Sequence, residues 1–305
     1  MSQNWRIFQT VLFAVLCMMV APHAAYSQLL TPESERPLWM GARGASMAEA
    51  NSADITDVSA FYWNPGALGF LKRVSLVFDE YYEMRTAINN DMVAAAIPHI
   101  SDGTLAFGAS ISDVGYIKKV HPYDYEAIAY GFDLGYGAVF SQGFSAGFRL
   151  HAQLGHTPNT NLFTSYWSFG VIYNPSAEIT YGLACSGLGE GLLLVDSASM
   201  VKETLPRRLE VGVTMHYPAS HERQFLTISV ANEKIFGESG LYYKTGVEVL
   251  PVSYIAFRYG YSFGPVVSAP RFGVGLKTDY IRLDYAIAPS YMSTRYQQVT
   301  LSINL

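Results

Sequence analysis

Cysteine is almost absent from this chain. Among its 305 residues there are two cysteines, Cys17 and Cys185, and Cys17 falls inside an apolar run near the N-terminus. If that run belongs to an export signal that is removed, Cys185 stands alone and has no partner for an internal disulfide. A small secreted domain held together by disulfides is therefore excluded.

Charged residues are also scarce. Asp, Glu, Lys and Arg together make up 15% of the chain, and the formal net charge is −5 at pH 7. Proteins that bind nucleic acid usually carry clustered positive charge, so this balance argues against a nucleic-acid partner. After residue 27 there is no apolar stretch of about 18 residues, so the remaining sequence offers no candidate for a transmembrane helix.

Residues 1–27 have the features of a cleavable signal peptide. Arg6 supplies a positive n-region, and VLFAVLCMMVA (11–21) is an apolar run of h-region length. AYS (25–27) then provides the small residues that a cleavage site needs. We therefore predict that the chain is exported.

Aromatic residues and glycine are abundant, and their arrangement indicates a β-barrel. The chain has 22 tyrosines, 17 phenylalanines and 26 glycines. This composition fits a secreted soluble β-protein or an outer-membrane barrel, and periodicity separates the two. From residue 73 onward, segments of roughly ten residues with alternating apolar character are separated by turn residues, which is typical of a membrane barrel. The fourteen segments are 73–82, 91–99, 103–114, 125–140, 143–156, 160–173, 177–186, 207–217, 222–232, 241–250, 253–263, 270–278, 279–288 and 295–305.

The lengths of the connections support this interpretation. Breaks after even-numbered segments are short, as at 141–143 and 174–177, whereas breaks after odd-numbered segments are longer, as at 117–124 and 187–207. Outer-membrane barrels have short periplasmic turns and longer extracellular loops, and a soluble sandwich has no reason to sort its loops this way. We predict an all-β fold, a transmembrane barrel of about fourteen antiparallel strands in the bacterial outer membrane.

The two-residue period of a strand divides each segment into two faces. In 253–263, Phe257 and Tyr259 share one face, and Ala256 and Arg258 share the other. A charge facing lipid costs roughly 2–4 kcal/mol, so we assign the charged face to the lumen. These side chains either form a static charge network between strands or line a lumen that conducts solute. The predicted lumen-facing polar residues are Asp79, Asp133, Arg149, His151, Glu210, His216, Glu248, Arg258, Lys277, Arg282 and Asp284.

Residues 28–72 precede the first segment and show no two-residue period. They are too apolar for a free tail, so we predict that they form a plug inside the barrel, which occupies 73–305. The alternative is an ordinary turn that leads into the first strand. The plug would be fixed to the wall through one motif, in which aromatic residues fill space and the last three make a tight turn. This motif is Phe61, Tyr62, Trp63, Asn64, Pro65 and Gly66.

Four stretches of the sequence resemble the PorV/PorQ family of outer-membrane proteins. MGARGASMAEA (40–50) and DITDVSAFYWNPGALGFL (54–71) resemble the N-terminal plug of that family, which belongs to a wider FadL-like group of fourteen-stranded barrels. LPRRLEVGV (205–213) and FGVGLKTDYIRLDYAIAP (272–289) are also similar to it. Two positions depart from the family pattern. Gly66 stands where alanine is usual, and Glu49 stands where glycine is more usual.

The resemblance implies two different roles. PorV and PorQ proteins serve type IX secretion, where they bind exported cargo or hold an attachment complex at the cell surface. FadL proteins instead pass hydrophobic small molecules inward. Similarity to the family favours secretion or surface attachment, with secretion-system components or exported cargo as partners in addition to outer-membrane lipid. The alternative is a channel for a hydrophobic small molecule.

A candidate partner surface lies in the long connection 187–207, which the predicted topology places outside the cell. An apolar run in such a loop suits a protein partner or an apolar ligand, unless the loop folds over and closes the barrel mouth. The run consists of Leu192, Leu193, Leu194 and Val195.

The sequence does not favour an enzyme. GFSAG (143–147) matches the G-x-S-x-G pattern of serine hydrolases, and His151 follows it. That pattern needs a strained strand-to-helix turn, whereas Ser145 begins an alternating strand. The spacing of His, Cys and carboxylate residues shows no metal site. We predict a non-enzymatic protein with no cofactor.

Overall fold

The computed structural model describes residues 40–84, 89–113, 117–120, 123–125, 128–157, 160–195, 199–218, 225–265, 268–288 and 296–305. The predicted signal peptide and the first part of the predicted plug lie outside these residues. Within these ranges there are three short helical turns, α2 (Ala42–Ser46), α3 (Ala60–Trp63) and η2 (Pro65–Phe70). In the described ranges, no helix has the length and apolar character needed to cross a membrane.

The rest of the described chain is β-structure. Two short strands pair only with each other, and the others belong to one antiparallel sheet. The strands are β1 (Ser75–Glu83), β2 (Asn89–Ile100), β3 (Gly103–Asp113), β4 (Ile117–Val120), β5 (Tyr123–Tyr125), β6 (Ile128–Ser141), β7 (Phe144–Thr157), β8 (Thr160–Ser176), β9 (Ile179–Val195), β10 (Ser199–Thr204), β11 (Arg208–Tyr217), β12 (Leu226–Ile235), β13 (Tyr242–Val252), β14 (Ile255–Phe263), β15 (Ala269–Lys277), β16 (Ile281–Ala288) and β17 (Tyr296–Asn304).

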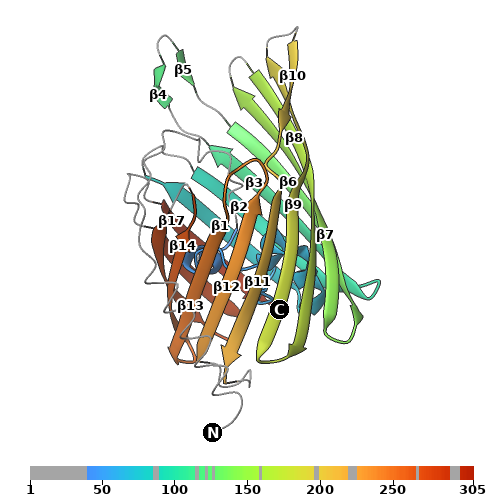
Figure 1. Ribbon diagram of the computed structural model, residues 1–305, viewed down its shortest axis with the longest axis vertical. Helices are drawn as coiled ribbons and strands as arrows, with labels where there is room; N and C mark the ends of the chain where they lie inside the picture. Colours follow the sequence, from blue (N-terminus) through green and yellow to red (C-terminus); the bar gives the residue numbers. More distant parts are fainter. Residues whose placement is uncertain are drawn as a thin grey trace. The chain divides into compact units, whose positions relative to one another are not determined.

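Fourteen of these strands close into a barrel (Figure 1). Each is antiparallel to its two neighbours, the last strand β17 pairs with the first strand β1, and β8 pairs with β9. β10 adds a further strand beside the far end of β9, and β4 and β5 form a separate hairpin. The predicted all-β barrel of fourteen antiparallel strands is therefore confirmed.

Alternation along the strands separates an apolar outer face from a polar inner face. In β14, Phe257 is 53% exposed and Tyr259 is 37% exposed, whereas Ala256 and Arg258 between them are buried. Large apolar side chains on the outer face of the other barrel strands are exposed in the same way. A closed antiparallel sheet with this pattern buries its polar side chains inside and presents its apolar side chains outside.

The prediction that 187–207 is a loop is wrong for most of that range. β9 continues to Val195, where its far half pairs with β8 on one side and β10 on the other. Leu192 to Val195 therefore lie in a strand, and their side chains are outside the described part of the chain. The glycine-rich stretch GLGEG (187–191) resembles a turn, but Gly187 has φ 76 at a register shift, so a bulge lets the strand continue.

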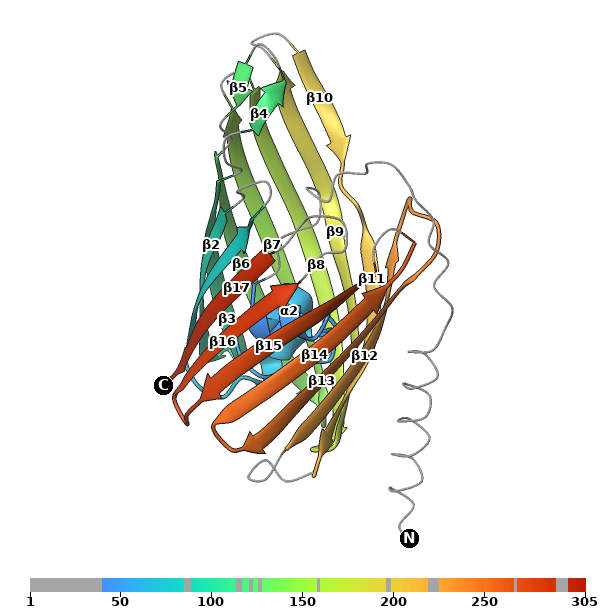
Figure 2. The same cartoon turned by 90° about the vertical axis from the view of Figure 1, so that its left-hand side faces the viewer.

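Residues 40–72, here called the N-terminal segment, lie within the ring of strands (Figure 2). α2 contacts β14 to β17, and η2 contacts β3 and β6 to β8 on the other side. Met40, Phe61 and Leu68 are fully buried. With Val58 and the inner side chains of β1 to β3 they form the main hydrophobic cluster of the described chain. The segment thus packs against nearly the whole circumference of the inner face.

Candidate functional site

The motif FYWNPG is the joint between two short helices of the N-terminal segment. α3 ends at Asn64, whose backbone is extended, and Pro65 is the first residue of η2. Asn64 Oδ1 accepts a hydrogen bond from the Gly66 amide at 3.0 Å, and Nδ2 donates to the carbonyl oxygens of Ser52 at 2.6 Å and Val171 at 3.2 Å. One amide side chain therefore caps the second helix and joins the segment to β8.

The three aromatic residues before Asn64 are all buried. Phe61 and Tyr62 pack edge to face, with ring centroids 4.3 Å apart. The indole nitrogen of Trp63 donates to the carbonyl oxygen of Met40 at 3.2 Å, which ties the start of the segment to α3. Buried aromatic rings help to fix the fold of this short segment, which has few other elements to pack on.

Glycines on the barrel wall give the N-terminal segment its space. At ten of them, on nine strands, an added Cβ would lie less than 3.0 Å from an atom of the segment. At Gly182 the distance to the carbonyl oxygen of Ser52 would be 1.8 Å, and at Gly147 the distance to that of Pro65 would be 2.3 Å. The high glycine content of the sequence is thus explained in part by close backbone approach. The ten are Gly108, Gly135, Gly137, Gly147, Gly170, Gly182, Gly212, Gly246, Gly260 and Gly273.

A wall substitution at one of these glycines should displace the segment. We expect Gly182→Val to destabilise the folded chain by about 1–3 kcal/mol or more, because the new side chain meets backbone that cannot rotate away. The control is Ala95→Val, which adds bulk on the outer side of β2 between the exposed Val93 and Ile97. The measurement is the temperature at which the folded band converts to the unfolded band in a gel. Equal temperatures for the two variants would contradict the close approach.

Arg43 on α2 makes the central polar contact between the N-terminal segment and the wall. Its Nε and Nη2 donate to the two carboxylate oxygens of Glu248 on β13, each at 3.1 Å. Its Nη1 contacts the carboxylate of Asp54, which lies further along the segment. All three side chains are buried. A two-pronged arginine–carboxylate pair fixes orientation as well as distance, so this contact sets how α2 sits against β13.

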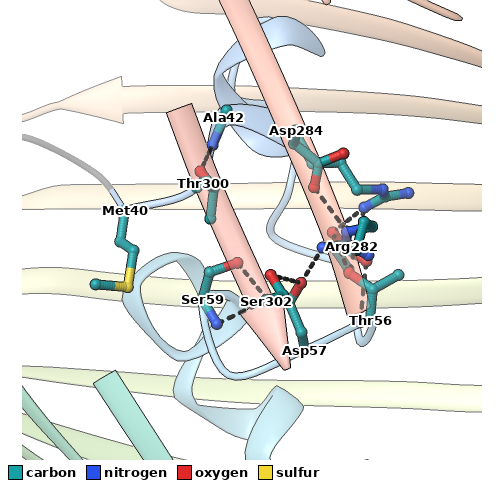
Figure 3. Close-up of polar contacts among 12 residues, drawn as sticks. Met40, Ala42, Thr56, Asp57, Ser59, Arg282, Asp284, Thr300 and Ser302 are labelled. Atoms are coloured by element: carbon teal, nitrogen blue, oxygen red, sulfur yellow. Dashed lines mark hydrogen bonds and ion pairs between the residues drawn. The ribbon is translucent and has the colours of Figure 1, made fainter. Parts of the chain in front are cut away.

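Further ion pairs lead from Glu248 along the barrel wall and end at a second residue of the N-terminal segment. Arg258 Nε donates to Glu248 at 2.5 Å, and its Nη1 lies 2.8 Å from Asp284. Arg282 Nε donates to the other oxygen of Asp284 at 2.6 Å, and its Nη2 contacts Asp57 (Figure 3). Charges of opposite sign alternate throughout, and both ends of the series are aspartates of the N-terminal segment. We call this series the ion-pair chain: Asp54, Arg43, Glu248, Arg258, Asp284, Arg282 and Asp57.

Asp57 and Arg43, two members of the ion-pair chain that belong to the N-terminal segment, stay charged at neutral pH. Burial alone would raise the pKa of the Asp57 carboxyl, but Arg282 and hydrogen bonds from Ser59 hold it below its ordinary value. Burial would likewise lower the pKa of Arg43, but the carboxylates of Asp54 and Glu248 raise it above its ordinary value. Each buried charge is therefore compensated by a partner on the opposite element.

A second group of charges holds the far end of α2. Glu49 contacts Arg271 on β15 and lies 3.8 Å from Lys244 on β13. Lys244 Nζ is also 2.6 Å from Glu210 and 3.0 Å from Glu233. Glu49 has φ 63, a conformation that favours glycine, which explains why glycine is the more usual residue here in the family that the sequence resembles. The carboxylate contacts compensate for the backbone cost.

A third group lies on the opposite wall, around Arg149 of β7. Its guanidinium is 3.4 Å from Asp133, donates to the hydroxyl of Tyr166 at 2.9 Å, and lies 4.8 Å from the ring centre of Tyr62. His151 Nδ1 is 2.8 Å from the same oxygen of Asp133. Arginine over aromatic faces is a favourable cation–π arrangement, which is stronger when the pair is shielded from water. This group joins α3 to β6, β7 and β8.

The remaining predicted residues have separate environments. Asp79 on β1 accepts hydrogen bonds from the Gly41 amide at 3.2 Å and from Gln298 at 2.7 Å, so it holds the start of the described chain. His216 lies 3.3 Å from Thr227 on the next strand. Lys277 is exposed at the end of β15. The charges of Arg282, Glu248 and Arg43 act on Lys277, so it lies near the ion-pair chain.

Sequence reasoning missed the charged residues on the segment side of these contacts. Arg43, Glu49, Asp54 and Asp57 lie in a stretch without a strand period, so no pattern assigned them to a face. Several wall residues were also missed, although the alternation of their strands places them inside. These are Arg208, Glu233, Lys244 and Arg271.

Ser145 of the GFSAG sequence has a structural role. It is fully buried in β7, and its hydroxyl donates to the carbonyl oxygen of Gly66 at 2.7 Å. It therefore joins η2 to the wall. Among the residues that the structure describes, no group of three or more His, Cys, Asp or Glu side chains is arranged to hold a metal ion.

Comparison with known proteins finds the same fold in other barrels of known structure. No family model matches the chain, and no curated protein matches it. The toluene transporter TodX of P. putida superposes with a TM-score of 0.64 at 10% identity, over 87% of this chain and 98% of that one. The toluene transporter TbuX of Ralstonia pickettii gives 0.59 at 13% identity, over 87% and 97%. A Pseudomonas aeruginosa FadL homologue gives 0.59 at 10% identity, over 86% and 97%. The shared feature is a FadL-like barrel fold.

Proposed function

We propose that this protein is an outer-membrane channel for hydrophobic small molecules, in which residues 40–72 act as a plug. The observation that carries the proposal is a fourteen-stranded barrel closed on itself around its own N-terminal segment. Its fold is similar to barrels described as toluene transporters. The barrel wall is apolar on its outer face, and its inner face is joined to residues 40–72 by hydrogen bonds and ion pairs. This arrangement suits a membrane protein that passes solutes without opening a water-filled pore.

Two aromatic girdles support a place in the membrane. At the end with short turns, Tyr217, Tyr254 and Tyr280 are 50–60% exposed, and Tyr243 and Phe263 stack at the other end. From Tyr254 to Phe263 there are nine steps along the chain. At about 3.3 Å a step and a tilt of about 40°, this spans roughly 23 Å, close to the apolar band of about 25 Å in known barrels.

We propose that the end of the barrel with the longer connections faces outward and the end with the short turns faces the periplasm. This orientation can be tested with single cysteines. We expect Ser239→Cys, in the turn between β12 and β13, to react with an impermeant maleimide on intact cells. Ala177→Cys, in the turn between β8 and β9, should react only after the outer membrane is opened. Both positions are exposed, and both variants carry Cys185→Ser to remove the native thiol. Equal labelling of both, or labelling of Ala177→Cys alone, would contradict the orientation.

The pairing of the charged side chains inside the barrel favours a closed lumen and argues against one that conducts ions. Arg43, Asp57 and Glu49 of the plug pair with the wall residues Glu248, Arg282 and Arg271. Of these, Glu248 and Arg282 were expected either to form a static charge network or to line a conducting lumen. A charge that is paired and buried no longer attracts a passing ion, because its field is compensated locally. The inner polar residues therefore serve mainly to hold the plug, and ions should not pass.

The secretion role has weaker support. It rested on the resemblance to the PorV/PorQ family, and no family model matches the chain. Its candidate partner surface was Leu192 to Val195 as an apolar run in an exposed loop, but these residues lie in β9 with a paired strand on each side. TodX and TbuX, which share this fold, are toluene transporters. Uptake of an apolar solute is thus the better proposal.

The test is uptake by whole cells. A Gram-negative host that expresses the chain should take up radiolabelled toluene several-fold faster than the same host with an empty vector, because its own outer leaflet slows apolar solutes. Gly182→Val, if it still reaches the outer membrane, is the matched variant with a displaced plug. Uptake equal to the empty vector, with the folded barrel shown to be present, would contradict the proposal.

A further inference from the structure

Among the described strands, one pair of neighbours in the barrel wall is not consecutive along the chain. Every other neighbouring pair is joined by a turn or a longer connection, whereas β1 begins the barrel and β17 ends it. The two strands pair from Ser75 with Asn304 to Glu83 with Tyr296, and we call this pair the seam. No connecting turn resists its separation, and separation would expose two unpaired strand edges.

The start of the N-terminal segment is bonded to both strands of the seam. Asp79 on β1 lies directly opposite Thr300 on β17, and both side chains are buried. The Gly41 amide donates to Asp79 Oδ1 at 3.2 Å, and the Ala42 amide donates to Thr300 Oγ1 at 2.6 Å (Figure 3). Asp79 also accepts hydrogen bonds from the Thr300 hydroxyl and from Gln298 of β17. Two successive backbone amides therefore hold opposite sides of the seam.

A later part of the N-terminal segment makes a second bridge. Asp57 contacts Arg282 of β16 and accepts a hydrogen bond from Ser302 of β17 at 3.5 Å. Val58, the next residue, belongs to the hydrophobic cluster that includes Val77 of β1. Neighbouring residues of the segment thus reach both sides of the seam again.

The chain itself already attaches the N-terminal segment to one side of the seam. Residues 71–74 lead from the end of η2 into β1. At the same end of the barrel, the amide of the terminal Leu305 donates to the carbonyl oxygen of Val74 at 2.8 Å. The segment is therefore continuous with β1 and reaches β17 through side-chain and amide contacts.

We propose that the N-terminal segment is a latch that holds the seam closed, with Asp79 and Thr300 as its positioning residues. The chain joins the segment to β1, and the contacts of Ala42 and Asp57 join it to β17. The segment thus takes the place of the turn that the seam lacks. This role goes beyond the proposed transport, since it concerns closure of the wall and involves no solute.

The physical reason is that opening the seam would break contacts that have no substitute inside the barrel. If β17 moved away from β1, the amides of Gly41 and Ala42 could not keep both Asp79 and Thr300 as acceptors. A buried donor or acceptor that loses its partner costs more than the hydrogen bond itself contributed. The latch therefore makes the open seam rarer than the backbone ladder alone would make it.

The test uses two variants, one on each side of the same contact. Thr300→Val keeps the shape of the wall side chain and removes the acceptor of the Ala42 amide. Ala42→Pro removes the donor and leaves Asp79 and Thr300 in place, and proline is tolerated here because Ala42 is the first residue of α2. The control is Thr214→Val on β11, a buried threonine whose hydroxyl lies 3.0 Å from that of Ser229 on the next strand.

Hydrogen exchange of the backbone amides in the purified barrel measures the opening. The amides of a strand pair exchange when that pair opens, so peptides that cover β1 and β17 report on the seam. Peptides that cover β14 and β15 are the reference, because the chain connects these two strands and α2 also contacts them. We expect Thr300→Val and Ala42→Pro each to raise exchange in the seam at least about fivefold, as the loss of one buried hydrogen bond requires, with less than about twofold change in the reference. Thr214→Val should leave the seam unchanged.

A selective rise in the seam for both variants supports the latch. A rise for one variant alone would mean that the contact between Ala42 and Thr300 is not what holds the two strands together. An equal rise in all four strands would indicate a general loss of stability, and no rise in either variant would show that the backbone ladder suffices. Each of these three results would overturn the proposal, and none of them bears on toluene uptake.

Discussion

Replacing Arg43 by methionine is expected to destabilise the folded barrel by about 3–5 kcal/mol and to let small ions leak through it. Arg43 is 5% exposed and lies between the carboxylates of Asp54 and Glu248, so its removal leaves buried charge unpaired. Methionine keeps an unbranched side chain of similar length, so the loss is mainly electrostatic. The temperature of band conversion in a gel and the conductance of planar bilayers measure the two effects.

Two further variants isolate the ion pairs. Arg73→Met removes an arginine at the exposed end of the barrel, where it is 3.5 Å from the carbonyl oxygen of Asp279, and should change stability by less than about 1 kcal/mol. Adding Asp54→Asn to Arg43→Met should recover part of the loss, because one of the unpaired charges is removed. If Arg43→Met and Arg73→Met are equally stable, the ion-pair chain does not hold the plug.

Deletion of residues 28–72 is expected to give the largest change in conductance. Barrels of sixteen or more strands leave a water-filled channel, and eight strands are filled by their own side chains, so a barrel of fourteen should be open without its plug. The ten wall glycines that accommodate the plug would leave additional space. We expect the single-channel conductance in planar bilayers to rise at least about tenfold over the intact chain.

This comparison needs evidence that the shortened barrel has assembled. A folded band that converts on heating provides it, since that conversion requires a closed barrel. An assembled barrel that conducts no better than the intact chain would mean that wall side chains or loops close the lumen by themselves. In that case the N-terminal segment would be a structural insert and not a plug.

The barrel could be predicted from the sequence because its strands follow a simple two-residue alternation of apolar and polar side chains. Alternation in segments such as 253–263 gave the strand number and the inward position of Arg258, and charge at such positions cannot face lipid. The extent of β9 was not predicted, because Gly187 and Gly189 resemble a turn and only the paired neighbours β8 and β10 show that the strand continues. Strand ends depend on pairing partners, which a single segment does not contain.

The contacts of the N-terminal segment were beyond reach for a related reason. Residues 40–72 have no repeating pattern, so Arg43 and Asp57 could not be assigned to partners 205 and 225 positions away. The motif at Asn64 and Pro65 did indicate a turn, and the structure shows that turn between α3 and η2. Local turn chemistry can be deduced from adjacent residues, whereas an ion pair across a barrel depends on the closed fold.

The most direct test of the account compares an apolar and a polar solute in the same cells. Cells that express the chain together with a periplasmic β-lactamase are assayed for uptake of radiolabelled toluene and for hydrolysis of nitrocefin, a polar solute that must cross the outer membrane to be cleaved. The account predicts toluene uptake several-fold above the empty vector with nitrocefin hydrolysis unchanged. Faster nitrocefin hydrolysis with no gain in toluene uptake would contradict it, because the barrel would then be an open polar pore.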